Sequence, residues 1–343
     1  MKQLLNTLFV TTENAYASLD KENVVLRVED DMIARYPLHI LEGICLFTYS
    51  GASPALMGEC AKRGINLTFL TPNGKFLART IGESKGNVLL RRTQYRVADD
   101  ESQSCKIARS FIFGKVNNAK NILSRMRRDH AERIDDEAFI TAIHQMREAL
   151  GLILDADSLD SLRGFEGAAS SIYFRRLDDM ILRDKDNFYF HERNRRPPKD
   201  NVNAMLSFAY VLLAGECASA LENVGLDAYV GVFHQDRSGR KSLALDLMEE
   251  LRPCMADRFV LKLINDRVVQ ADDFIKQQSG AVELKDDARK RFLKEWQTKK
   301  QVEITHPFLK EKIQWGLVPH VQALLLARYL RGDIDAYPPF LYK

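Results

Sequence analysis

The hydrophobic and polar positions of the first 90 residues follow the short, turn-bounded pattern of β-strands. Tight-turn signals lie at Asp30-Asp31 and at Thr71-Pro72-Asn73-Gly74, between neighbouring apolar runs. One stretch, 54–63, is instead typical of a short helix. The runs rich in β-branched and aromatic residues predict strands at 4–10, 24–28, 32–36, 44–49, 66–70 and 76–80. Together these segments predict an antiparallel β domain with one small helix.

From about residue 88 the hydrophobic period changes to that of α-helices. Apolar residues recur at helical intervals over 107–126. Residues 201–221 form a longer apolar stretch, and Asp200 or Asn201 is in position to cap its first turn. A further helix is expected at 242–251. The second part of the chain is therefore predicted to be helical.

This change of pattern predicts an α+β fold, which suits a chain of 343 residues with room for two domains. We expect a β-rich N-terminal domain at 1–85 and a linker at 86–100. A larger all-α domain is expected at 101–343.

Composition then narrows the class of protein. The chain is 45% hydrophobic and 28% charged, which is ordinary for a globular protein and argues against a disordered or collagen-like one. The five cysteines are scattered and form no Cys-x-x-Cys pair, so neither a disulfide framework nor a thiolate zinc site is expected. The first ten residues lack a signal-peptide pattern, and we expect no membrane span. A soluble, cytoplasmic protein is predicted.

The net charge of +3 does not by itself indicate a nucleic-acid partner, but its distribution is uneven. Eight basic residues lie between Lys106 and Arg133, opposed only by Asp129 and Glu132. A basic helical run of this kind can neutralise phosphates. A solvated helix face is the alternative interpretation of the same run.

The first segment suited to metal chemistry is Arg163-Gly164-Phe165-Glu166-Gly167-Ala168-Ala169-Ser170. It places one carboxylate, Glu166, among small residues that allow a second backbone or a DNA strand to approach closely. We expect Glu166 at the start of a helix, where a carboxylate also complements the helix dipole. That structural role is the alternative to a catalytic one.

The second segment is the short apolar run from Tyr229, which ends at His234. A neutral imidazole is a common ligand of divalent ions, and a structural histidine with satisfied hydrogen bonds is the alternative. The loop that follows is basic. Together with Arg163, its basic residues are candidates for phosphate contact: Arg237, Arg240 and Lys241.

The third segment, Ser242 to Arg252, has Asp246 and Glu249 three positions apart, and therefore on one face of the expected helix. Two neighbouring carboxylates repel each other unless a cation or a proton lies between them. Glu250 points elsewhere. An acidic pair on a solvated helix face is the alternative.

Combined, the three segments supply Glu166, His234 and Glu249 as ligands for one divalent ion. Oxygen ligands with a single imidazole suit Mg²⁺ or Mn²⁺ rather than structural zinc. Such an ion activates water or a DNA 3′-hydroxyl and stabilises the charge of phosphoryl transfer.

In this order, the three segments resemble the CRISPR-associated endonuclease-integrase family, the catalytic subunit of the spacer-acquisition complex. The stretch 195–210 resembles a helix motif of that family, and 242–250 resembles its carboxylate helix, with the match continuing through Arg252-Pro253 and 256–260. The motif-level resemblance covers 163–265. Over the first 90 residues it rests on the β-rich pattern alone.

The resemblance implies a dimerising N-terminal domain, a helical catalytic domain and a homodimer. It also implies that the homodimer binds double-stranded DNA and assembles with a small second acquisition subunit. It assigns the metal ligands to Glu166, His234 and Glu249, the last of which is Asp in many members. Asp246 matches a further acidic position, either a ligand or a group that orients one. The implied reaction is transesterification, in which the 3′-hydroxyl of a short DNA fragment attacks a phosphodiester at the edge of a CRISPR repeat.

Two other functional classes stay open at this point. One is a DNA-binding scaffold without catalysis, in which Glu166→Ala changes no DNA activity. The other is a metal-dependent hydrolase of small phosphorylated molecules, which would not bind long duplexes.

The C-terminal stretch from Tyr337 is rich in proline and aromatic residues and cannot continue a helix. It is expected either to dock on a partner subunit or to pack back on the chain.

Overall fold

The computed structural model describes residues 6–72, 76–82 and 88–342, and it confirms the α+β class. The chain divides into two compact units. The β-rich unit holds residues 1–85, 284–303 and 314–317, and the helical unit holds 86–283, 304–313 and 318–343. Two short segments from the C-terminal part of the chain thus group with the strands. The stretch 86–100, expected to be a linker, contains helix α2 (Val88–Asp99), which packs on later helices of the helical unit.

The strands of the β-rich unit form two sheets. One sheet has the order β1-β5-β6-β7, and the other is an antiparallel three-stranded sheet of β2, β3 and β4. The bounds are β1 Asn6–Val10, β2 Tyr16–Asp20, β3 Asn23–Val28, β4 Asp31–Pro37, β5 Leu41–Leu46, β6 Asn66–Leu70 and β7 Phe76–Arg79. Strand β2 is the one element of these sheets that the sequence pattern did not predict.

The expectation of a purely antiparallel domain is wrong. β1 pairs with β5 and β5 with β6 in parallel, and only β6 and β7 are antiparallel. Parallel neighbours need a crossover connection, and helix α1 (Pro54–Arg63) supplies one between β5 and β6. Ser53 caps α1, and Gly64 ends it with a φ of 70° that favours glycine. Of the predicted turn at 71–74, residues 73 and 74 lie outside the described residues.

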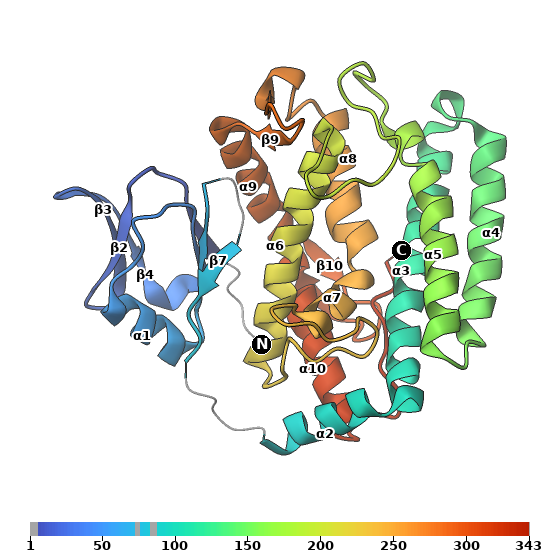
Figure 1. The fold of residues 1–343 in the computed structure, drawn as a ribbon, viewed down its shortest axis with the longest axis horizontal. Helices are drawn as coiled ribbons and strands as arrows, with labels where there is room; N and C mark the ends of the chain where they lie inside the picture. Colours follow the sequence, from blue (N-terminus) through green and yellow to red (C-terminus); the bar gives the residue numbers. More distant parts are fainter. Residues whose placement is uncertain (1–5, 73–75, 83–87, 343) are drawn as a thin grey trace. The chain divides into compact units, whose positions relative to one another are not determined.

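The helical unit is built from long, closely packed helices. Helices α3, α4 and α5 lie side by side, and α6 packs against α7 and α10 (Figure 1). The bounds are α3 Glu101–His130, α4 Asp136–Leu154, α5 Leu159–Arg175, α6 Asn201–Asn223, α7 Ser242–Glu249, α8 Arg258–Asn265 and α10 Val318–Leu330. Helix α9 (Asp286–Lys300) belongs to the β-rich unit. Four short strands form two pairs, β8 Phe274–Lys276 with β9 Val282–Leu284 and β10 Glu303–Thr305 with β11 Lys312–Gln314.

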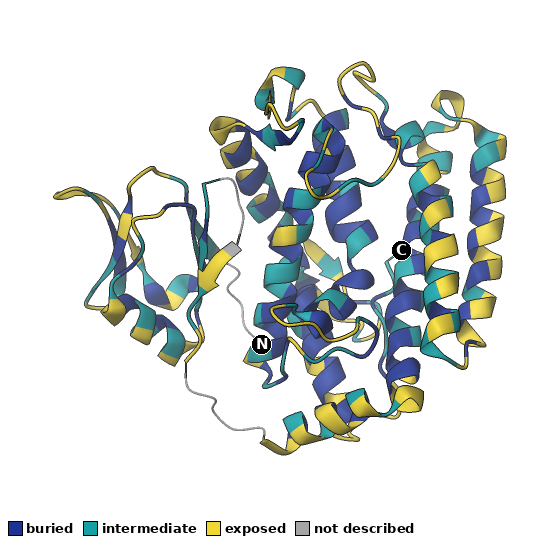
Figure 2. Ribbon diagram, viewed as in Figure 1, coloured by how far each residue is buried: buried dark blue, intermediate teal, exposed yellow. Residues whose placement is uncertain are grey.

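Helix α6 lies in the interior of this unit. Asp200 caps it by accepting a hydrogen bond from the Asn203 amide at 2.7 Å. By length and composition alone the helix could cross a membrane, since an 18-residue window has a mean hydropathy of 1.6. The sequence pattern, in contrast, predicts no membrane span. Of that window, 61% is buried inside the fold, and an all-round apolar helix is what a protein core requires (Figure 2).

Helix α5 begins earlier than the sequence pattern indicated. Ser158 caps it, and its first residue is Leu159, so Glu166 lies about two turns inside the helix and not at its start. The expected position of Glu166 is therefore wrong. The alternative of a first-turn carboxylate that complements the helix dipole no longer applies, because that effect is confined to the terminal turn.

The C-terminal stretch packs back on the helical unit. Tyr337 and Phe340 are buried, and both approach Glu250, which follows the last residue of α7. The Tyr337 hydroxyl donates to Glu250 Oε1 at 2.5 Å, and the Phe340 amide donates to Oε2 at 2.8 Å. Asn118 of α3 donates to the Phe340 carbonyl at 2.7 Å. Of the two expectations for this stretch, the structure shows packing back on the chain.

Truncation after Asp335 is therefore expected to destabilise the fold. It removes two buried aromatic side chains and leaves the Glu250 carboxylate without two of its donors. We expect a loss of at least about 4 kcal/mol in the free energy of unfolding, measured by chemical denaturation. Asp335→Ala, an exposed change just before the cut, is the control and should unfold like the wild type. An unchanged unfolding midpoint in the truncated chain would contradict this role of the tail.

Candidate metal centre

The site is organised by Asp246, a fully buried carboxylate on α7. Its Oδ2 accepts the backbone N–H groups of Val232 and Phe233 at 2.7 and 3.0 Å, and its Oδ1 accepts that of His234 at 2.9 Å. These bonds hold the irregular segment before α7 against the helix. Gly231 permits the close approach, because a Cβ there would lie 2.7 Å from the Cβ of Ser242. Asp246 thus fixes the backbone that positions His234.

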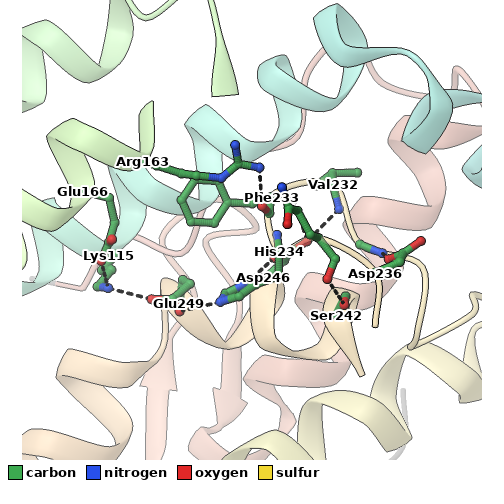
Figure 3. Close-up of polar contacts among 12 residues, drawn as sticks. Lys115, Arg163, Glu166, Val232, Phe233, His234, Asp236, Ser242, Asp246 and Glu249 are labelled. Carbon is green, nitrogen blue, oxygen red and sulfur yellow. Dashed lines mark hydrogen bonds and ion pairs between the residues drawn. The ribbon is translucent and has the colours of Figure 1, made fainter. Parts of the chain in front are cut away.

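The same carboxylate also orients the imidazole of His234. Nδ1 of the ring lies 2.6 Å from Asp246 Oδ1, and a carboxylate can only accept there, so Nδ1 carries a hydrogen. The other ring nitrogen, Nε2, then has a free lone pair when the ring is neutral. Nε2 lies 3.8 Å from Glu249 Oε1 (Figure 3). A carboxylate that holds one nitrogen and directs the other is the usual arrangement behind a metal-binding histidine.

Glu249, at the last position of α7, is a buried acid surrounded by cations. Glu249 is only 3% exposed to solvent. Burial raises its pKa, but the nearby charges of Arg252, Lys115 and His234 outweigh burial and lower the pKa to about 2. The Arg252 guanidinium lies 3.2 Å from Oε1. Glu249 is therefore ionised throughout the neutral pH range.

Glu166 faces Glu249 from the neighbouring helix α5, and Lys115 of α3 lies between them (Figure 3). The Lys115 ammonium forms an ion pair with Glu166 and lies 2.7 Å from Glu249 Oε2. The Ser170 hydroxyl donates to Glu166 Oε1 at 2.7 Å. Burial lowers the pKa of Lys115, but Glu249 and Glu166 more than compensate and raise it. Lys115 is thus a charged cation held by two carboxylates.

Sequence reasoning missed Lys115 as a site residue and counted it among the basic residues of one helical run. A signal was present, because Lys115 lies four positions from both Phe111 and Ala119, on the buried face of α3. Other members of that run are paired at the surface. Arg127 pairs with Asp136 at 2.7 Å, which favours the solvated-face interpretation for that part of the run.

The candidate ligands fit a divalent ion by their chemistry. Glu166 and Glu249 offer carboxylate oxygens, and His234 offers an imidazole nitrogen of the correct tautomer. As they stand, no three His, Cys, Asp or Glu side chains among residues 6–72, 76–82 and 88–342 form a ready-made cluster for an ion. The Lys115 ammonium lies between two of the three candidates. Asp246 is engaged with four N–H groups and is placed behind His234.

The candidate phosphate-binding residues lie on the segments that flank this group. Arg163 donates to the Phe233 carbonyl at 3.2 Å, and its guanidinium lies 5.8 Å from the centre of the Phe233 ring. The other three lie on the segment between His234 and α7. Of these, Arg237 is exposed, and Arg240 and Lys241 are half-buried.

Known proteins resemble this chain over its whole length. The family model for "CRISPR associated protein Cas1" matches residues 8–298. A protein of Chlorobaculum tepidum, named CRISPR-associated endonuclease Cas1 1, is 47% identical over 343 residues, covering 100% of both chains. A protein of Rhodospirillum rubrum, named CRISPR-associated endonuclease Cas1 2, is 47% identical over 347 residues, again covering 100% of both.

Among solved structures, a casposase bound to its integration product has the same fold. It superposes with a TM-score of 0.83 at 22% identity, covering 99% of this chain and 95% of the casposase. A chain of a Cas6-RT-Cas1–Cas2 complex superposes with a TM-score of 0.80 at 21% identity, covering 100% of this chain and 37% of the larger one.

Proposed function

This chain belongs to the Cas1 family of CRISPR-associated endonucleases, and we propose that Glu166, His234 and Glu249 hold the divalent ion with which it cuts and joins DNA. The protein is a nuclease-integrase of CRISPR spacer acquisition, a role supported by its endonuclease relatives and its casposase-like fold. Its five free cysteines, four of them buried, suit the reducing cytoplasm that we propose as its location.

One observation supports this assignment of the site above all others. Two carboxylates from different helices share one cation, and a histidine whose Nε2 is directed by Asp246 approaches the same group at 3.8 Å. Within the low-dielectric interior, such an arrangement is stable only with positive charge at its centre. We propose that Mg²⁺ or Mn²⁺ supplies that charge in the active enzyme.

A metal ion held there would lower the pKa of a bound hydroxyl and screen the negative charge of the reacting phosphate. The residues of the chain have separate tasks. Asp246 keeps the lone pair of His234 Nε2 directed at the site. Glu249 stays ionised at neutral pH because its pKa is about 2. Arg163, Arg237, Arg240 and Lys241 are proposed to bind the DNA backbone and to position it.

The proposed substrates are a short double-stranded DNA fragment and a CRISPR repeat. A 3′-hydroxyl of the fragment would attack a phosphodiester at the repeat edge, and hydrolysis would be the same reaction with water as the nucleophile. The structural relative named above is bound to its own integration product, which supports this direction of the chemistry. A relative found in a complex with Cas2 supports a small second subunit as the partner.

We also propose a homodimer formed through the β-rich unit. The sheet of β2, β3 and β4 carries large apolar residues that are exposed in the single chain: Tyr16, Met32, Ile33 and Tyr36. Exposed apolar residues gathered on one sheet favour a protein interface over solvent.

Replacing Met32 and Ile33 together by aspartate is expected to convert the dimer to a monomer. Burying two uncompensated carboxylates in an interface costs several kcal/mol, which is about a thousandfold or more in the dissociation constant. Light scattering coupled to size-exclusion chromatography measures the mass. Leu152→Asp, at an exposed position of α4, is the matched control and should leave the mass unchanged. An unaltered mass for the double variant would remove this interface from the account.

The function is tested by an integration assay with supercoiled repeat-containing DNA, the partner subunit and a titration of Mn²⁺ or Mg²⁺. Wild type should join the fragment, and Glu166→Ala should bind DNA, with an affinity that falls steeply as salt rises, but join none. Equal joining by both proteins would contradict the role of Glu166, and DNA binding without joining by the wild type would favour the non-catalytic scaffold. No binding to duplex DNA would favour a hydrolase of small phosphorylated molecules.

A further inference from the structure

Lys115 occupies the place where the proposed ion would bind. Its Nζ lies 2.7 Å from Glu249 Oε2 and also forms an ion pair with Glu166. A divalent ion bonded to that Glu249 oxygen at about 2.2 Å would come within roughly 5 Å of the ammonium. The Lys115 side chain is only 12% exposed, so little solvent screens the repulsion between the two cations. Metal and ammonium therefore compete for the same carboxylates.

A pocket beside the site offers the ammonium another position. Lys115 lines it, and its other polar lining residues are Ser170, Tyr173, Tyr210, Arg252 and Asp257, while the remaining six lining residues are apolar. Asp257 is 2% exposed and accepts a hydrogen bond from the Tyr210 hydroxyl at 2.5 Å. The Tyr173 hydroxyl is buried, and burial together with the nearby charge of Asp257 raises its pKa.

Two of these groups offer oxygen acceptors to an ammonium. Asp257 has a second carboxylate oxygen, and the Tyr173 hydroxyl has free acceptor capacity. Arg252 also lines the pocket, but its guanidinium forms an ion pair with Glu249. A lysine has a flexible four-carbon stem, so its ammonium can change partners while its backbone stays within α3.

We propose that Lys115 is a built-in counter-cation that holds Glu166 and Glu249 together until the metal ion arrives, and then turns into the pocket toward Asp257 and Tyr173. This inference rests on the proposed function, because it takes the two glutamates as metal ligands. The ammonium prevents the two carboxylates from repelling each other in the metal-free protein. Metal binding then includes the displacement of Lys115, which weakens the apparent affinity for the ion.

The first test is the affinity for Mn²⁺ without DNA, measured by isothermal titration calorimetry and by the electron paramagnetic resonance signal of free Mn²⁺. Lys115→Gln and Lys115→Met should both bind Mn²⁺ at least about tenfold more tightly than wild type, because the competing cation is gone. Met offers no oxygen ligand, so agreement between the two variants excludes a new ligand from glutamine. Lys120→Gln, on the same helix with its ammonium bonded to Asn117, is the control.

Thermal unfolding gives a second readout that does not depend on catalysis. Without metal, both Lys115 variants should melt below wild type, because two buried carboxylates then face each other uncompensated. Saturating Mn²⁺ should raise the melting temperature of the variants more than that of wild type. Equal or weaker Mn²⁺ binding by both folded variants would overturn the proposal, and so would equal metal-induced shifts.

The destination of the ammonium is tested by Asp257→Asn. This variant should weaken Mn²⁺ binding when Lys115 is present and have little effect when Lys115 is glutamine, because only the lysine needs the acceptor. Equal effects in both backgrounds would remove the pocket from the account. Glu166→Ala combined with Lys115→Gln tests the assignment of the metal ligands separately from the role of Lys115. If that double variant binds Mn²⁺ as tightly as Lys115→Gln, Glu166 is not a ligand and the proposed metal site is wrong. The affinities of the single Lys115 variants test whether Lys115 competes with the ion.

Discussion

His234→Ala is expected to lower metal-dependent strand joining by on the order of a thousandfold or more, while the fold stays intact. The imidazole contributes the only proposed nitrogen ligand, and Asp246 already fixes its orientation. Its removal leaves the two glutamates as proposed ligands, and Asp246 keeps its three backbone N–H donors. The side chain is 19% exposed, so the cavity that alanine leaves is open to water and costs little stability.

The measurement is the rate of strand joining under single-turnover conditions, with thermal unfolding recorded on the same samples. His144→Ala is the matched control, since His144 is an exposed histidine on α4 that pairs with Glu148 at the surface. It should join DNA at the wild-type rate. Full activity of His234→Ala would refute the site, and a large drop in melting temperature would make the variant uninformative for catalysis unless DNA binding persisted.

Asp246→Asn is expected to reduce both stability and activity, which distinguishes it from His234→Ala. The buried carboxylate accepts four N–H bonds, and an asparagine amide places N–H groups against some of these donors. Unpaired buried donors cost about 1–3 kcal/mol each, so we expect a loss of about 3 kcal/mol. For a unit of this size that lowers the melting temperature by roughly 6–12 °C.

Activity should fall in Asp246→Asn even well below its melting temperature. The ring of His234 loses the partner that fixes its tautomer, and Nε2 is no longer directed toward Glu249. Calorimetry and the strand-joining rate at low temperature are the two measurements. Asp266→Asn, an exposed carboxylate paired with Lys262 at the end of α8, is the control. A variant at 246 with wild-type stability and activity would show that Asp246 does not organise the site.

Hydrophobic periodicity predicted much of the fold, and the errors of that prediction have physical causes. The helix at 54–63 and the apolar helix from 201 were predicted because their caps and periods are local signals. The parallel pairing of β1 with β5 was not predicted, because the two strands lie far apart in the chain and no local sequence signal indicates which strands pair. Strand β2 was missed because Tyr16-Ala17-Ser18-Leu19-Asp20 has few β-branched residues and depends on its pairing with β3.

The site shows the same division. Glu166, His234 and Glu249 were predicted from residue chemistry and from the family resemblance. In the structure Lys115 pairs with both glutamates, and His234 Nε2 lies 3.8 Å from Glu249 Oε1. Lys115 was not predicted as a site residue, because a lysine in a basic run is usually exposed. Only the tertiary packing of α3 against α5 and α7 buries it. The Asp257 pocket also depends on packing, since helices α3, α5 and α6 contribute to its lining.

The central claim is that Glu166, Glu249 and His234 bind one ion. A crystal structure of the protein soaked in Mn²⁺, with anomalous data collected for manganese, tests it most directly. One anomalous peak is expected within about 2.3 Å of a Glu166 oxygen, a Glu249 oxygen and His234 Nε2, with the Lys115 ammonium displaced. A peak elsewhere in the molecule, or Lys115 still between the two glutamates at saturating Mn²⁺, would contradict it.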